Sequence, residues 1–182
     1  AGVWTHVAGT YDGTTLRQLT DNDGLNESSL VLSGAAAAWM GPGDTPRTQI
    51  FYYGGQSVQQ ITDTEIYNRY PSLCGDRIAW VYGSDDQQDL DKEIHFYDGS
   101  QIVALTANAY PDQGPRVSET HVVWYGWDGL DYEIFVYDGA MVQQLTDNDY
   151  DDMQPEISGS TIVWCGHVGG TGREIFMAVP EP

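Results

Sequence analysis

The chain has few basic residues, and their scarcity excludes two classes of partner. Only 7 of its 182 residues are Lys or Arg, against 27 Asp and Glu, which gives a formal net charge of −20. Nucleic acids and anionic membrane surfaces both attract proteins through Lys and Arg. We therefore expect no nucleic-acid partner, whereas cations, basic proteins and neutral glycans are compatible with the charge.

Long apolar runs, cysteine pairs and helical periodicity are also missing. No run approaches 18 apolar residues, so we expect no membrane insertion. The two cysteines, Cys74 and Cys165, are too few for a disulfide framework. No stretch repeats apolar residues with a helical period. The chain does contain 21 Gly, 8 Pro and many aromatic residues, a composition that favours short strands joined by tight turns.

Three sequence markers recur in step along the chain. Each marker returns every 40 to 44 residues, and a repeat of this length with regular turn signals is typical of propeller blades. The first is a Trp, the second is the Thr that ends a Q-L-T-like triplet, and the third is a Tyr that usually begins a Y-D-G turn. They are Trp39, Trp80, Trp124 and Trp164; Thr20, Thr62, Thr106 and Thr146; and Tyr11, Tyr53, Tyr97 and Tyr137.

Each repeat has the pattern of four short strands. In the third copy they fall at 115–118, 121–125, 133–137 and 141–146. The Asp-Gly pair between the last two strands is a strong hairpin signal. Four antiparallel strands in about 40 residues form one propeller blade. The sequence therefore predicts an all-β fold, a small propeller of four blades.

The predicted ring closes with strands from both ends of the chain. Residues 8–11 and 175–178 occupy the same position in the repeat, four repeats apart. One strand is therefore redundant, and it closes the ring or pairs with a second molecule to give a homodimer. We expect one domain, 1–182, with repeats at about 8–49, 50–93, 94–133 and 134–174 and a closing strand at 175–178.

The repeated pattern L-T … P-x-[I/V/L]-x-G-x-x-I-[V/A]-W … E-I-F-x-Y-D-G resembles the repeats of TolB-type (PD40/WD40-like) propellers and related bacterial and archaeal surface proteins. The resemblance covers residues 14–178. It implies a fold and a general binding role rather than a chemistry. The S-P-D-G turn of that family is absent, and G-D-R, E-T-H and G-S-T stand in its place.

The two ends of the chain resemble other sequences. Residues 3–17 resemble the central hairpin of laminin-G-like jelly rolls, and we interpret them as a hairpin of the ring, with a remnant of a neighbouring domain as the alternative. Residues 179–182, V-P-E-P, resemble the start of the PEP-CTERM sorting signal. That resemblance implies an exported protein, extracellular or at the cell surface.

One face of the predicted propeller is acidic and aromatic. The loops that join fourth to first strands and second to third strands emerge on the same face, and they hold most of the acidic residues. One interpretation is that the acidic loops have no role other than keeping the protein soluble. The alternative is a binding face for a protein or glycan. Its candidate ligand-binding residues are Tyr67, Tyr110, Trp127, Tyr132 and Tyr150.

The loop sequence D-N-D-Y-D-D is a candidate calcium site. Ca²⁺ prefers several carboxylate oxygens, and Asp147, Asp149 and Asp151 alternate along this loop. It is not an EF-hand, because position six is Asp152 and position twelve is Ser158. Calcium is the only cofactor that the sequence suggests.

Signals of catalysis are weak. The four His residues fall at different repeat positions without metal-ligand spacing, and no G-x-S-x-G motif occurs. Asp and Glu are so abundant that no pair is singled out for glycoside cleavage. We therefore expect a non-catalytic recognition scaffold. The alternatives are a carbohydrate-active, glycosidase-like propeller and a structural surface repeat domain.

Overall fold

The computed structural model describes residues 10–11, 14–15, 18–21, 26–84, 92–170 and 172–180. Within them the only helical segment is the short 3-10 turn η1 (Val168–Gly170), so the predicted all-β class is confirmed. The strands are β1 (Thr10–Tyr11), β2 (Thr14–Thr15), β3 (Ser28–Ser33), β4 (Ala36–Pro42), β5 (Thr48–Tyr53), β6 (Val58–Gln60), β7 (Tyr67–Cys74), β8 (Arg77–Gly83), β9 (Lys92–Tyr97), β10 (Ile102–Ala104), β11 (Asp112–Val117), β12 (Val122–Trp127), β13 (Tyr132–Tyr137), β14 (Val142–Gln144), β15 (Asp152–Ser158), β16 (Thr161–Gly166) and β17 (Glu174–Ala178).

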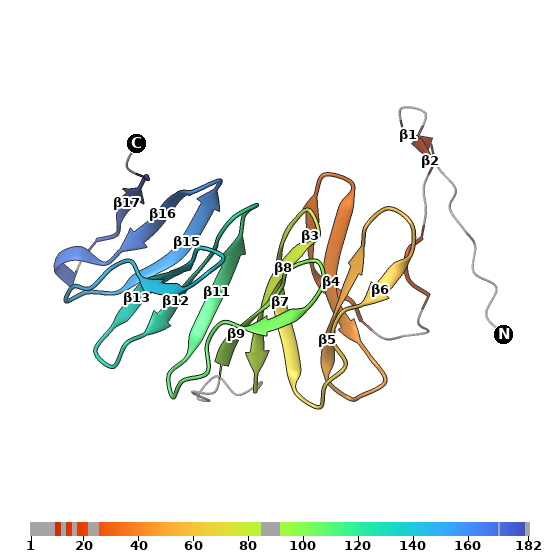
Figure 1. Cartoon of the computed structure of the whole chain (residues 1–182), viewed down its shortest axis with the longest axis horizontal. Coiled ribbons are helices and arrows are strands. Elements are labelled where there is room, and N and C mark those ends of the chain that lie inside the picture. Colours follow the sequence, from red (N-terminus) through yellow and green to blue (C-terminus); the bar gives the residue numbers. More distant parts are fainter. Residues whose placement is uncertain are drawn as a thin grey trace.

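Strands β3 to β17 form four antiparallel sheets, each made of consecutive strands, and β1 and β2 form a separate two-stranded sheet. Blade 1 is β3–β6, blade 2 is β7–β10, blade 3 is β11–β14, and blade 4 is β15–β17. The blades follow one another along the long axis of the molecule in chain order (Figure 1). The first strand of each later blade packs against the blade before it, as β7, β11 and β15 do. The strand order predicted for a blade is therefore correct.

The Y-D-G sequences of blades 2 and 3 form the predicted tight turns between third and fourth strands. In blade 2, Asp98 Oδ1 accepts hydrogen bonds from the backbone N–H groups of Ser100 (2.8 Å) and Gln101 (2.9 Å). The next residue, Gly99, has φ of 98°, a left-handed conformation that glycine adopts without steric cost. The Asp side chain and the Gly backbone thus account for the motif.

A bulge interrupts the first strand of every blade, which the sequence did not predict. In blades 2, 3 and 4 a left-handed residue precedes a proline, with φ of 54° at Tyr70, 61° at Gly114 and 57° at Gln154. The pairing register shifts at the same place. In blade 3 the strand therefore begins at Asp112, three residues before the predicted start. Proline cannot donate to the ladder, and the bulge accommodates it.

The hydrophobic core lies between the blades. Each junction packs apolar side chains of one blade against the next, and the recurring Trp residues occupy the middle of the blades. Their exposed fractions are 4% for Trp39, 0% for Trp80, 0% for Trp124 and 9% for Trp164. The predicted burial of all four is confirmed.

The predicted joint blade of the two chain ends is not what the structure has. Among the described residues, β1 and β2 pair only with each other, and β17 pairs only with β16. The β1–β2 hairpin and β17 lie at opposite ends of the row of blades (Figure 1). Repeat position fixes the place of a strand within a blade, but it does not bring the first and last blades together. The homodimer alternative stays a prediction.

Parts of the end-of-chain predictions fall outside the described residues. They are most of 3–17, the laminin-G-like segment, and 181–182 of the V-P-E-P segment. No described helix has the length and apolar character that a membrane crossing requires.

Candidate functional site

The Thr of the Q-L-T-like triplet has a structural role within blades 1, 2 and 3. In blade 1, Thr62 Oγ1 accepts a hydrogen bond from the backbone N–H of Ile50 (2.9 Å) and donates to Gln49 Oε1 (2.8 Å). In blade 3, Thr146 Oγ1 bonds the backbone N–H of Ile134 in the same way (2.8 Å) and donates to the Glu133 carboxylate. The motif therefore locks the fourth strand to the third.

In blades 2 and 3 a second polar contact ties the recurring Trp to the first strand of its blade. Trp80 Nε1 donates to Asn68 Oδ1 (2.7 Å), and Trp124 Nε1 donates to Asp112 Oδ1 (2.8 Å). Asn68 and Asp112 are 1% and 4% exposed. In this way a buried indole N–H is satisfied by an acceptor at the start of the first strand.

Two polar residues meet between neighbouring blades. They are two amides at the first junction, and acidic residues occupy the corresponding positions at the next two junctions. Gln49 and Asn68 face each other between blades 1 and 2, with a hydrogen bond of 3.1 Å. At the next junction the corresponding residues are Glu93 and Asp112. Burial raises the pKa of Asp112 to about 6, and the Glu93 charge adds to the rise. Burial likewise raises the pKa of Glu133 at the following junction.

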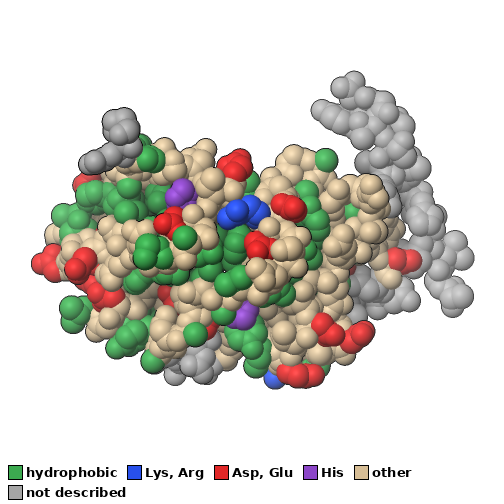
Figure 2. All heavy atoms as spheres, viewed as in Figure 1, with side chains coloured by type: hydrophobic (Ala, Val, Ile, Leu, Met, Phe, Trp, Pro, Cys, Tyr) green, Lys and Arg blue, Asp and Glu red, His purple; other side chains and the backbone are tan. Residues whose placement is uncertain are grey.

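A pocket lies between the loops of blades 3 and 4. Its volume is about 910 Å³. It is lined by Leu130, Asp131, Asp149, Tyr150, Asp151, His167, Gly169, Gly172 and Arg173. Acidic side chains spread over the face of the molecule seen in Figure 2, and basic ones are few. Carboxylates, one tyrosine ring and two nitrogen-bearing side chains thus meet in one concave site.

Asp151 holds the walls of this pocket together. Its Oδ1 accepts a hydrogen bond from the backbone N–H of Tyr132 in blade 3 (3.1 Å). Its Oδ2 lies 3.7 Å from His167 Nδ1 in blade 4. The backbone N–H of His167 also donates to the Asp151 carbonyl (2.9 Å). The loop before β15 is therefore fixed to both neighbouring loops.

Three of the predicted aromatic residues lie on blades 3 and 4 near this pocket. Tyr150 lines it and stacks on Phe176, with ring centroids 6.3 Å apart. Trp127 and Tyr132 make an edge-to-face contact with centroids 5.3 Å apart. Burial and the nearby Asp151 charge raise the pKa of Tyr132.

The other two predicted aromatic residues do not line the pocket. Tyr110 is 42% exposed, sits in the loop before β11, and has its hydroxyl beside Gly129 of the loop between β12 and β13. Tyr67 belongs to the junction of blades 1 and 2, where its hydroxyl accepts a hydrogen bond from Arg47 (2.7 Å). The structure therefore does not gather all five residues in one site, and their role in binding stays a prediction.

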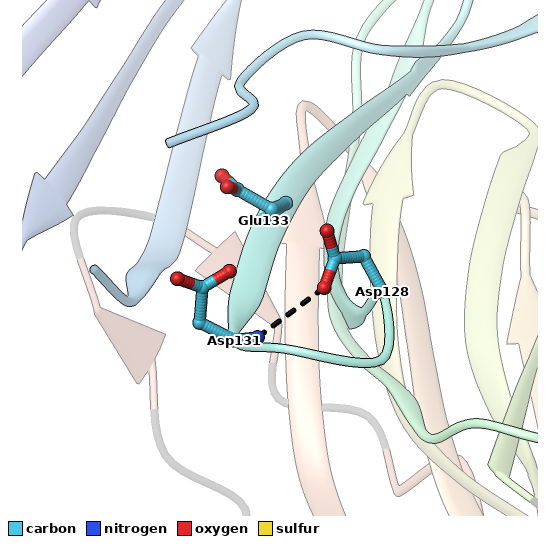
Figure 3. Close-up of side chains that lie close together, drawn as sticks. All are labelled: Asp128, Asp131 and Glu133. Carbon is cyan, nitrogen blue, oxygen red and sulfur yellow. Dashed lines mark hydrogen bonds between the residues drawn. The ribbon is translucent and has the colours of Figure 1, made fainter. Parts of the chain in front are cut away.

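The structure separates the residues of the predicted calcium loop. Asp149 and Asp151 line the 910 Å³ pocket, whereas Asp147 is exposed and is not part of its lining. A different acidic group lies beside the pocket, in the loop between β12 and β13 and at the start of β13. One oxygen each of Asp128, Asp131 and Glu133 lie within 4.8 Å of one another. Figure 3 shows how the three side chains lie.

This second acidic group could hold a metal ion. Asp131 Oδ1 is buried and has no hydrogen-bond partner, and burial together with the Asp128 charge raises the pKa of Asp131. Asp128 Oδ1 already accepts the Asp131 backbone N–H (3.2 Å) (Figure 3). Glu133 accepts from Thr146 and from the Asn148 backbone N–H. Asp131 Oδ1 is therefore the oxygen that a bound cation would compensate. In the sequence the three acids form the pattern D-x-x-D-x-E.

Comparison with known proteins places the fold. No known family profile matches the chain, and no curated protein matches its sequence. A putative TolB from Agrobacterium tumefaciens is 19% identical over 73% of this chain and 50% of its own, with a TM-score of 0.53. The β-propeller domain of the trilobed protease from Pyrococcus furiosus, for which an open velcro topology is described, is 11% identical over 92% and 56%, with a TM-score of 0.65. Pyrococcus horikoshii acylaminoacyl peptidase is 10% identical over 92% and 27%, with a TM-score of 0.66.

The chain thus has the fold of TolB-like β-propellers, as the resemblance of its repeats implies. It spans about half the length of the TolB and trilobed-protease structures that it matches. At these identities the likeness concerns the fold alone, because one fold supports many unrelated functions. The function has to be argued from the site.

Proposed function

We propose that the chain is a non-catalytic binding module of an exported or surface protein, which binds a protein or glycan through the loop face of blades 3 and 4. The observation that carries the proposal is the 910 Å³ pocket between these blades. Its size falls within the range of ligand sites, roughly 300–1,000 Å³. Its carboxylates accept hydrogen bonds, and the Tyr150 ring offers an apolar surface beside them.

The buried carboxylates favour binding over catalysis. A glycosidase-like enzyme needs one acid and one base that face the substrate. Asp112 and Glu133 instead sit at positions that recur from blade to blade, and both accept hydrogen bonds that tie together the strands of blade 3. Their raised pKa values follow from this structural burial. The structural role of these positions in the repeat thus explains the raised pKa values without a catalytic function.

A glycan array and a protein-binding screen test the proposal, using the wild type and two variants at the pocket. Tyr150→Ala removes the ring and Asp149→Asn removes one exposed charge. Each should weaken binding about tenfold, since single anchor residues contribute on the order of 1–2 kcal/mol. Glu119→Gln is the matched control, because Glu119 is exposed in the turn between β11 and β12, at the other end of the blade.

The outcomes separate the candidate functions. Loss of binding in both pocket variants but not in Glu119→Gln supports the proposed face. Wild-type protein that binds nothing in either screen favours a structural repeat domain and overturns the proposal. Hydrolysis of a bound glycan by the wild type would favour the carbohydrate-active alternative.

A second candidate function is cation binding beside the same face. Asp128, Asp131 and Glu133 favour it, because hard cations such as Ca²⁺ bind several carboxylate oxygens. A cation that binds only the folded chain stabilises it by mass action. Millimolar Ca²⁺ should therefore raise the melting temperature more than NaCl of equal ionic strength.

Two variants locate such a site. The Asp128→Asn/Asp131→Asn protein should lose the calcium-specific shift if the cluster after β12 binds the ion. An Asn triple variant at Asp147, Asp149 and Asp151 should lose it if the loop before β15 does. Equal shifts in wild type and both variants would mean that Ca²⁺ only screens a diffuse acidic surface, and equal effects of Ca²⁺ and NaCl on wild type would end the cation proposal.

A further inference from the structure

The two end blades of the row each present one face to no neighbouring blade. At the three internal junctions, the second and third strands of one blade pack against the first and second strands of the next. Among the described residues, blades 1 and 4 each contact another blade on one side only (Figure 1). Blade 4 therefore has one half of a further junction, and blade 1 has the other half.

The free face of blade 4 consists of positions that are buried in the other blades. In blades 1 to 3 the Ile just before the strand partner of the recurring Trp is 0% exposed. Its counterpart in blade 4, Ile175, is 71% exposed. Met177 is also exposed, whereas its counterparts in blades 2 and 3 are buried. This blade-4 face lies on β16 and β17 and consists of Val163, Cys165, Ile175 and Met177.

The free face of blade 1 consists of positions at the bulge of the first strand. The residue after the left-handed one is a buried proline in blades 2, 3 and 4, namely Pro71, Pro115 and Pro155. In blade 1 this residue is Leu30, and it is exposed. Leu32 is 71% exposed, although its counterpart in blade 3 is 7% exposed. Leu30 and Leu32 form the blade-1 face.

A pocket of about 260 Å³ lies on the blade-1 face, and Leu19, Leu30 and Trp39 contribute to its lining. At each internal junction, the buried Ile of one blade lies in the same apolar cluster as the recurring Trp of the next blade. These pairs are Ile50 with Trp80, Ile94 with Trp124, and Ile134 with Trp164. The same arrangement beside Trp39 requires an Ile from a blade that precedes blade 1. Ile175 of a second copy of the chain meets this requirement.

We propose that the blade-4 face of one chain packs on the blade-1 face of a second copy, and that two copies joined head to tail close one ring. Both faces are apolar, and burial of apolar surface is the main driving force of association. Head-to-tail interfaces close into rings where the rotation between copies permits it. This contact joins faces of blades, in contrast to a dimer formed by pairing of a redundant strand.

The length of the chain supports two copies per ring. One chain covers 56% of the β-propeller domain of the trilobed protease, so two chains supply the blades of about one propeller. A closed pair of chains has two identical junctions and leaves no blade face free. The loop face of blades 3 and 4 takes no part in either junction, so the pairing is independent of the proposed binding function.

Sedimentation equilibrium of the whole chain tests the pairing. In about 0.15 M NaCl the Debye length is about 8 Å, which limits repulsion between two chains of net charge −20. We expect the mass to rise with concentration and to level off at about twice the chain mass of 20.1 kDa. A single-chain mass up to millimolar concentration overturns the proposal. A mass that continues to rise beyond the pair also overturns it, because the ring is then not closed by two copies.

Met177→Gln and Met141→Gln form a matched pair of variants. Both replace an exposed Met by a side chain of similar size, since Met177 is 64% and Met141 is 59% exposed. Met141 belongs to blade 3, which is not an end of the row. Met177→Gln should weaken pairing about tenfold or more, and Met141→Gln should leave it unchanged. Equal pairing of the two variants contradicts the proposal. Because Met177 is exposed in the single chain, Met177→Gln should keep the unfolding midpoint of dilute protein.

Leu32→Gln tests the opposite half of the junction. A head-to-tail contact needs both faces, so this variant should weaken pairing as Met177→Gln does. A mixture of the two variants should recover part of the pairing, because one of its two junctions joins two unaltered faces. Loss of pairing in only one of the variants would indicate a contact between identical faces and would overturn the proposal.

The cysteines provide a measurement on the wild type. Cys165 lies on the blade-4 face beside Ile175, whereas Cys74 packs at the junction of blades 2 and 3. Pairing covers Cys165, so its alkylation should slow as the protein concentration rises, while the rate at Cys74 stays constant. A Cys165 rate that does not depend on concentration contradicts the proposal. Loss of ligand binding at the loop face would change none of these results.

Discussion

Replacing Asp112 by Asn should stabilise the folded chain at neutral pH much more than in mild acid. The pKa of Asp112 is raised from 3.8 to about 6, mainly by burial. Hydrogen bonds from Asn108 and Trp124 oppose the rise, and the Glu93 charge contributes to it. Between these two pKa values the folded state keeps a proton that the unfolded state releases. The free energy of unfolding of the wild type therefore falls as the pH rises through this window.

The magnitude follows from the size of the rise. About two pKa units correspond to about 3 kcal/mol, of which about 2 kcal/mol is lost between roughly pH 4.5 and pH 7.5. Asn cannot ionise, so the variant escapes this loss. Blade 2 already shows that Asn suits the position, since Asn68 Oδ1 accepts the Trp80 indole N–H (2.7 Å). The stability of Asp112→Asn relative to wild type should thus increase by about 2 kcal/mol over this pH range.

Urea denaturation of both proteins at the two pH values measures this difference. Comparing the two pH values removes any constant cost of the lost hydrogen bond from Asn108 (2.7 Å). Asp98→Asn is the control, because turn N–H groups lower the pKa of the exposed Asp98 to about 2. Its contribution is present above the unfolded pKa and is lost only as the pH falls toward about 2, so that variant should lose similar stability at both values. An Asp112→Asn effect that is the same at both values would refute the reasoning.

Two further predictions concern packing. Trp124→Ala should lower the free energy of unfolding by about 3–5 kcal/mol, because the ring is fully buried. Trp127 is half-buried, so Trp127→Ala should lower it clearly less. Equal losses of stability in thermal or urea unfolding would contradict the burial of Trp124 in the blade core. Gly114→Ala should cost about 2–3 kcal/mol, because a Cβ there would lie 2.5 Å from the Tyr125 ring at φ of 61°. At Gly159 φ is 58° and the space around it is open, so Gly159→Ala should lower the free energy of unfolding by only about 1 kcal/mol. Equal losses of stability in the two Gly variants would contradict the steric argument at Gly114.

The candidate site was only partly predictable from the chain. The loop face could be located, and Tyr150, Asp149 and Asp151 do line its main pocket. The cluster around Asp131 was missed, although D-x-x-D-x-E is visible in the sequence, because Asp and Glu are abundant throughout the chain.

The sequence by itself determined the period of the repeat, the order of four strands in a blade, the Asp-Gly turns and the burial of the recurring Trp residues. These features depend on local backbone preferences and on a pattern that each blade repeats, so they can be read along the chain. Tertiary structure alone decided that β1–β2 and β17 lie apart, so that no described strand from the N-terminal end joins the three of blade 4. It also decided which unlike side chains meet across a junction, as Arg69 and Lys92 do beside Gln113. Such meetings depend on how one blade packs on the next, and repeat position carries no information about side chains that break the repeat.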